Sequence, residues 1–196
     1  DISSEYPYTM NGINSYFTNY TLDTTFTTDP AILQALLPNY DILLFPEQES
    51  FAGYYTSIAS VVQNFASTGG SVVACGALGT GIQTRMFDLG LFNGTYVGYV
   101  NSGGNCTVID TSDDYMDNVP PSFAVTNSTF YLDVTNTDKT ELVSYNGYDV
   151  VTYRDYGSGR VMYVGFDFYD SSSATTHIIS NAIRYATSNS LANWIT

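Results

Sequence analysis

The chain has 196 residues, of which 44% are hydrophobic and 12% are charged. This length and apolar content exclude a disordered chain, and we expect one domain over residues 1–196. Five Lys and Arg face 19 Asp and Glu, a formal net charge of −14, which argues against binding to nucleic acid or anionic lipid. No apolar run approaches the roughly 20 residues that cross a bilayer, so no membrane insertion is expected.

The first forty residues are predicted to contain two helices and a short strand. Apolar residues between positions 8 and 20 recur at a spacing near 3.6, which is typical of an amphipathic helix. Residues 21–26 alternate like a strand. Asp29-Pro30 then begins a second helix, because Asp caps a helix N-terminus and Pro fits its first turn. Pro38 ends that helix.

A βαβ unit is predicted between Tyr40 and Gly76. Residues 41–45 (DILLF) form a continuous apolar run, as expected for a strand covered on both faces. The following helix has an apolar stripe that includes Ile58 and Phe65, and Gly69-Gly70 ends it. Residues 71–75 form the next buried strand, which ends at Cys75.

The second half is predicted to be rich in strands. A short helix is expected around Met86, and a buried strand and a final amphipathic helix follow residue 157. Asn146-Gly147 favours a type I′ hairpin, because both residues tolerate positive φ. A turn at residues 101–104 is expected to join its two flanking strands. The predicted strands cover residues 95–100, 106–109, 123–134, 141–145 and 149–154, and the last buried strand lies within residues 157–168.

The order of these elements resembles that of the class I glutamine amidotransferase-like proteins, in particular their non-catalytic ThuA-like and surface-protein relatives. The segments that carry the resemblance are YDILLFPEQES, VVQNFASTGGSVVACG and YRDYGSGRVMYVGFDFYD. It implies an α/β three-layer sandwich with a mostly parallel, flavodoxin-like sheet, extended by an antiparallel hairpin. The family's first strand is missing before the first helix. We hypothesise that another segment, such as the tail 191–196 of a neighbouring chain, fills an open slot in the sheet.

Cys75 is the main candidate for chemistry, because enzymes with this fold place a nucleophilic Cys near that position and a His after a later strand. Here Gly165-Phe166-Asp167-Phe168 occupies the stretch where that His is expected, and the chain's only histidine, His177, comes later. A thiol needs a nearby base or positive charge to ionise. Three alternatives remain: a nucleophile, a buried thiol, or a disulfide with Cys106. We expect the disulfide, which suits an oxidising compartment.

Two groups of acidic residues are further candidates. Paired carboxylates at the carboxyl ends of strands can catalyse glycoside hydrolysis or bind a hard metal, although exposed loops also gather acidic residues. This first group contains Glu47, Glu49, Asp167 and Asp170. The second group lacks the EF-hand spacing for Ca²⁺ and is interpreted as a solvated loop. It contains Asp110, Asp113, Asp114 and Asp117. No metal and no cofactor are therefore predicted.

Four N-x-Ser/Thr sequons predict N-linked glycans at Asn19, Asn93, Asn105 and Asn127. With the expected disulfide, they predict a secreted or cell-surface protein. The expected function is a non-catalytic structural or interaction module that self-associates, for example in a filament, or binds other surface proteins. The alternatives are a carbohydrate-active or other hydrolase domain, and a glycan or small-ligand binder at the carboxyl edge of the sheet.

Overall fold

The computed structural model describes residues 5–25, 27–47, 54–78 and 82–186. Helices and strands alternate in the first half, and strands dominate the second. The elements are α1 (Glu5–Asn14), α2 (Pro30–Leu36), η1 (Leu37–Asn39), β1 (Ile42–Phe45), α3 (Tyr55–Ser67), β2 (Ser71–Cys75), α4 (Arg85–Asp88), β3 (Gly94–Val100), β4 (Asn105–Val108), η2 (Asp114–Met116), β5 (Ser122–Ala124), β6 (Thr129–Val134), β7 (Thr140–Tyr145), β8 (Tyr148–Tyr156), β9 (Gly159–Val164) and α5 (Ser173–Ala186).

Within the described residues, nine strands form one mixed sheet in the order β1-β2-β9-β8-β7-β4-β5, and β6 joins β8 to β3. The parallel part consists of β1, β2 and β9. The other pairings are antiparallel, so the antiparallel extension is larger than the single hairpin that was predicted. The α/β sandwich itself is confirmed.

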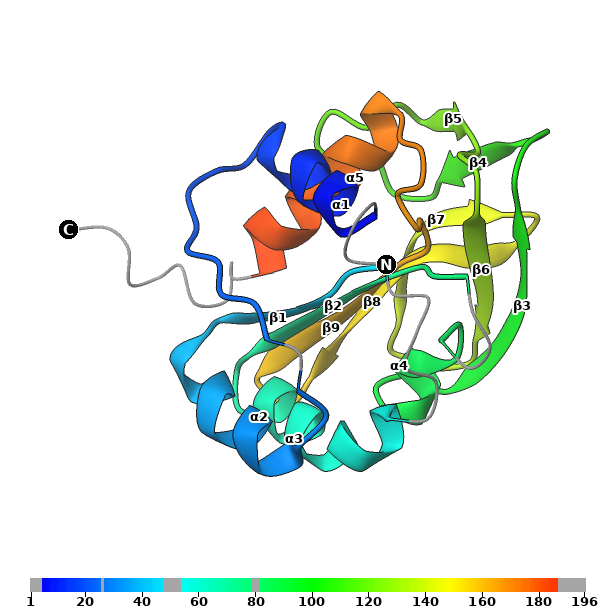
Figure 1. Cartoon of the computed structure of the whole chain (residues 1–196). Coiled ribbons are helices and arrows are strands. Elements are labelled where there is room, and N and C mark those ends of the chain that lie inside the picture. The colour runs from blue at the N-terminus through cyan, green and yellow to red at the C-terminus, as the bar shows by residue number, and fades with distance from the viewer. Residues whose placement is uncertain (1–4, 26, 48–53, 79–81, 187–196) are drawn as a thin grey trace.

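Two helical layers cover the parallel strands, α1 and α5 on one face and α2 and α3 on the other (Figure 1). Successive side chains of a strand point to opposite faces of the sheet, and the buried strand β2 follows this rule. In β2, Val73 and Cys75 belong to the apolar cluster that contains α5, whereas Val72 and Ala74 belong to the cluster that contains α3. The alternation of side chains along β2 therefore makes Cys75 face the layer that contains α5.

Local sequence signals explain several element boundaries. The Asp29 carboxylate accepts a hydrogen bond from the Ala31 backbone N–H at 2.8 Å and caps α2, as predicted. Gly69 has a φ of 119°, which ends α3 in the conformation expected of glycine. Asn146 and Gly147 have φ values of 52° and 80°, which confirms the predicted type I′ hairpin between β7 and β8.

Two predictions about the sheet need correction, and a third is not tested. Residues 21–25 form no strand. The strands β3 and β4 do not pair across residues 101–104; β3 pairs with β6, and β4 pairs with β5 and β7. No described strand precedes α1, and among the described strands β1 pairs with β2 only, so β1 is an edge strand. An edge of this kind can accept a further strand, so the donated strand stays a prediction, and the tail 191–196 lies outside the described residues.

Candidate functional site

Three sequence-predicted residues come together at the carboxyl ends of the parallel strands. Glu47 follows β1, Cys75 is the last residue of β2, and Asp167 follows β9. The register confirms this placement, because Cys75 lies opposite Val164 near the end of β9. This is the edge at which open α/β sheets position their ligands. Glu49, the fourth candidate here, lies outside the described residues.

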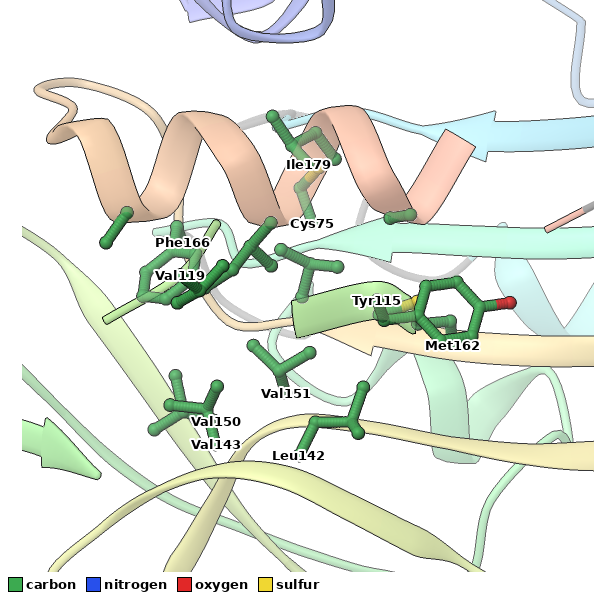
Figure 2. Packing of buried hydrophobic residues seen from close by; sticks show 14 of the residues in the cluster. Cys75, Tyr115, Val119, Leu142, Val143, Val150, Val151, Met162, Phe166 and Ile179 are labelled. Carbon is green, nitrogen blue, oxygen red and sulfur yellow. The ribbon is translucent and has the colours of Figure 1, made fainter. Parts of the chain in front are cut away.

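Cys75 is sealed inside the protein rather than presented to solvent. Its side chain is 0% exposed, and Figure 2 shows it beneath Ile179 of α5, inside the apolar cluster. Burial raises the pKa of the thiol to about 12; Arg85 opposes the shift, and the charges of Glu47 and Asp167 add to it. The next helix, α4, begins only at Arg85, so Cys75 does not sit on a tight strand-to-helix turn.

The base that a nucleophilic cysteine requires is not beside it. His177, the only histidine in the chain, stacks on the ring of Tyr16 with 3.7 Å between centroids. Partial burial lowers the pKa of its imidazole. After β9, the described residues include Asp167 at the position where the family's enzymes place a histidine, so the Cys–His pair is missing.

The predicted disulfide between Cys75 and Cys106 is not formed, because both cysteines are free and buried. Cys75 belongs to β2 and Cys106 to β4, and β9, β8 and β7 lie between them in the sheet. With a spacing of about 4.8 Å between strands, the two residues are much farther apart than the roughly 7 Å that a disulfide tolerates. Burial raises the pKa of the Cys106 thiol to about 12 as well.

Glu47 forms a carboxyl pair with Glu5, which the sequence analysis did not identify. Their side chains are 2% and 6% exposed, respectively, and a hydrogen bond joins them. Burial, together with the hydrogen bond and the charge of Glu5, raises the pKa of Glu47 to about 8. Two adjacent negative charges repel each other, so the charge of Glu5 favours the protonated form of Glu47.

Arg85 supplies the positive charge beside this pair. Its side chain is 1% exposed, and its Nη1 donates a hydrogen bond to the Pro46 carbonyl at 3.0 Å. The guanidinium lies 5.9 Å from the centroid of the Tyr55 ring. Arg85 is one of only five basic residues in the chain and starts the largely apolar segment RMFDLGLF, whose other charged residue is Asp88; sequence reasoning missed this signal.

Asp167 completes the cluster. Burial raises the pKa of its carboxyl to about 7, and the charges of Glu5 and Asp170 add to this shift. The Tyr169 backbone N–H donates to its Oδ1 at 3.0 Å and opposes the shift, as does a hydrogen bond with Ser128. Asp170 lies on the surface and accepts a hydrogen bond from the Asn127 backbone at 2.9 Å. Among the described residues, no three His, Cys, Asp or Glu side chains are placed to hold a metal ion.

The remaining predicted residues lie away from this edge. Asp113 caps the short helix η2 by accepting from the Tyr115 backbone N–H at 2.9 Å. Asp110 accepts from Ser112 in the same way, and Asp117 accepts from the Tyr185 hydroxyl at 2.6 Å. Asp110, Asp114 and Asp117 are exposed, which agrees with the predicted solvated loop, and these hydrogen bonds fix its conformation. Of the sequon asparagines, Asn19, Asn93 and Asn105 are exposed and Asn127 is half-buried.

No family model matches the chain, and no curated protein matches it. Several solved structures share its fold. A cytoplasmic protein from Salmonella typhimurium is 9% identical with a TM-score of 0.66, covering 91% of this chain and 85% of that chain. A ThuA-like protein from Bacteroides uniformis is 14% identical with a TM-score of 0.65, covering 93% and 82%. A protein described as a GMP synthase component from Thermoplasma acidophilum is 12% identical with a TM-score of 0.63, covering 98% and 94%.

These similarities confirm the flavodoxin-like fold shared with ThuA-like and amidotransferase-like proteins, and at such identities they show the fold alone. They contradict the predicted secreted, glycosylated surface protein, because a protein with this fold is described as cytoplasmic. The absence of the Cys75–Cys106 disulfide removes one of the two sequence features on which that prediction rested, the other being the sequons. None of the described helices has the length and apolar character that a membrane crossing requires.

Proposed function

We propose that this chain is a non-catalytic module with the amidotransferase-like fold, which acts by binding a ligand or partner. The observation that carries the proposal is the state of Cys75, which is fully buried and faces the α5 layer. A thiol pKa of about 12 lowers the thiolate fraction at neutral pH about a thousandfold relative to an ordinary cysteine. The described residues that directly follow β9 include no histidine to act as its base.

A second candidate function is hydrolysis by carboxyl groups at the same edge. It is favoured by the raised pKa values of Glu47, about 8, and Asp167, about 7, because perturbed carboxyl groups gather at functional sites. A glycosidase needs both carboxyl groups to reach the substrate. Glu47 and Asp167 are only 2% and 4% exposed, which favours a structural role for them.

Thiol reactivity tests the proposal directly. We expect the native protein to react with neither iodoacetamide nor Ellman's reagent over hours at pH 8, and to titrate two thiols after unfolding. Rapid alkylation of Cys75 in the native protein would overturn the proposal.

Activity assays provide the second test. Chromogenic amide, ester and glycoside substrates are expected to show no turnover above that of a heat-denatured sample. Turnover that is lost in Cys75→Ala but kept in Cys106→Ala, a matched buried cysteine on β4, would establish a cysteine enzyme. Turnover lost in Glu47→Gln or Asp167→Asn would establish the second candidate.

A further inference from the structure

The outer edge of β1 is the open end of the parallel part of the described sheet, where β1 pairs with β2 only. The Ser71 backbone N–H, on β2, donates to the Asp41 carbonyl at 2.9 Å. Backbone groups alternate in direction along a strand. Those of Leu43 therefore point toward β2, whereas the N–H and C=O groups of Ile42 and Leu44 point outward from this edge.

This edge is apolar and has none of the usual protection of an edge strand. Natural edge strands carry Lys or Pro, contain a bulge, or are covered by another segment. The sequence of β1 is ILLF, and its four residues pair with β2 in consecutive register. Its first three side chains are only half-buried, although a continuous apolar run is typical of a strand covered on both faces. A segment paired with β1 would cover these side chains and satisfy the outward backbone groups.

The end of α5 lies beside the start of this edge. The Ser71 hydroxyl donates to the Ala186 carbonyl at 2.5 Å, and Ser71 is the register partner of Ile42, the first residue of β1. The chain that leaves α5 is therefore two strand spacings, about 10 Å, from the position outside β1. Residues 187–190 (TSNS) can span about 13 Å when extended, which is enough to reach that position.

The helical layers give such a connection the favoured hand. The connection from β1 to β2 runs through α3, in the layer that also contains α2. A connection from β9 through α5 to the outside of β1 would cross the sheet in the opposite direction, with its helix in the opposite layer (Figure 1). Reversing both the direction and the layer leaves the hand unchanged, and about 98% of parallel crossovers are right-handed. The added strand would run parallel to β1, because it starts at the same end.

We infer that residues 191–195 of this chain (LANWI) pair with the outer edge of β1 as a further parallel strand. Leu191, Trp194 and Ile195 supply apolar side chains, and the alternation along a strand distributes them over both faces. The occupant is the chain's own tail rather than the tail of a neighbouring chain, because the connection from Ala186 is short and has the favoured hand. This inference goes beyond the proposed function and is independent of it.

Hydrogen exchange of the ¹⁵N-labelled full chain, followed by NMR, tests the pairing. The amides of Ile42 and Leu44 (the outward amides) are expected to be protected about a hundredfold or more relative to the unfolded chain, because a hydrogen-bonded amide exchanges only when its bond opens. The amides of Leu43 and Phe45, which face β2, are the internal standard. Exchange of the outward amides at the unfolded rate would overturn the inference.

A pair of double proline variants shows whether the tail provides this protection. Ala192→Pro with Asn193→Pro removes one backbone donor that faces β1, because neighbouring residues point to opposite sides. The outward amides should then exchange about tenfold faster or more. Ser188→Pro with Asn189→Pro makes the same change in the linker 187–190 and should leave their exchange nearly unchanged. Equal acceleration in both variants, or none in either, would contradict the pairing.

A mixture of ¹⁵N-labelled and ¹³C-labelled chains distinguishes the chain's own tail from the tail of a second copy. Light scattering is expected to give the mass of a monomer. Nuclear Overhauser contacts between β1 and residues 191–195 are expected to arise within one chain. Contacts between differently labelled chains would overturn the inference and show strand exchange between copies.

Discussion

Glu47 is a buried carboxyl group beside Glu5, and its raised pKa couples the stability of the fold to pH. The pKa of Glu47 in the folded protein, about 8, lies above its ordinary value of 4.5. Below pH 4.5 the group is protonated in both the folded and the unfolded chain. As the pH rises from there to about 8, only the unfolded chain gains by releasing the proton. Burial of Glu47 therefore makes the folded state less stable at pH 8 than at pH 5.

We predict that the free energy of unfolding falls between pH 5 and pH 8, and that Glu47→Gln reduces this fall. Glutamine can still hydrogen-bond to Glu5 but cannot ionise, so it removes about 3–4 kcal/mol of pH dependence between pH 5 and pH 8. Urea unfolding at several pH values, followed by circular dichroism, measures the effect. Asp133→Asn, at an exposed carboxyl on β6, is the control and should leave the slope unchanged. An identical slope in Glu47→Gln would contradict the prediction.

Sequence reasoning located part of the candidate site and missed the rest. Glu47, Cys75 and Asp167 were found because each stands at the end of an apolar run, and parallel strands bring their carboxyl ends to one edge. Glu5 and Arg85 reach that edge from helices whose docking the local pattern does not specify. The disulfide was wrong for a related reason, since the pairing of two cysteines depends on the strand order, which neighbouring residues do not encode.

At the scale of elements, β8 is the strand that joins the two parts of the sheet. It pairs with β7 on one side, and on the other side with β9 along residues 151–156 and with β6 at Asp149. Asp149 fixes this junction from a buried position. Its carboxylate accepts from the Lys139 ammonium at 2.6 and 2.8 Å and from the Val134 backbone N–H, on β6, at 3.1 Å. The charge pair therefore links the turn before β7 to both β6 and β8.

We expect Asp149→Asn and Lys139→Met each to destabilise the protein by about 2–4 kcal/mol, because either change leaves a buried partner uncompensated. The double variant should lose less than the sum of the two single losses. Equilibrium unfolding in urea gives all three values. Asp138→Asn, which breaks the more exposed pair between Asp138 and Arg154, is the control and should cost about 0–1 kcal/mol. Additive losses in the Asp149 and Lys139 variants would show that the pair is not coupled.

Sequence patterns correctly predicted the elements that interactions between neighbouring residues determine. The α2 cap at Asp29, the β2 limits and the Asn146-Gly147 hairpin follow from one or two residues each. Pairing between strands is less local. The strands β3 and β4 are neighbours in sequence and have a good turn between them, yet β3 pairs with β6, where Tyr99 stacks on Phe130 with 5.5 Å between ring centroids. Burial of Phe130 in the core outweighs the turn signal.

At the scale of the whole molecule, the formal net charge of −14 arises because 19 acidic residues face only five basic ones. Among the described residues, three salt bridges join Lys or Arg to Asp, two of which involve carboxylates that are largely exposed. With five basic residues against 19 acidic ones, most of the carboxylates have no Lys or Arg to pair with, and their negative charges repel one another. Self-repulsion of this kind lowers the stability of a compact state and is screened by salt.

The melting temperature is accordingly predicted to rise by several degrees between about 10 mM and 300 mM NaCl at pH 7.5. Differential scanning calorimetry measures the change, and KCl should give the same result because screening does not distinguish the two cations. A melting temperature that falls with salt would mean that attractive charge pairs outweigh the repulsion. A rise specific to one cation would indicate ion binding instead.

The pairing of β2 with β9 has a consequence for how the chain folds. These strands come from opposite halves of the sequence, and the Ser180 hydroxyl of α5 donates to the Ile13 carbonyl at the end of α1, 167 positions away. Such contacts close very long loops, and proteins dominated by them fold slowly. During synthesis, β2 and the apolar side of α1 stay uncovered until β9 and α5 have left the ribosome. The first half of the chain is therefore the part exposed to aggregation.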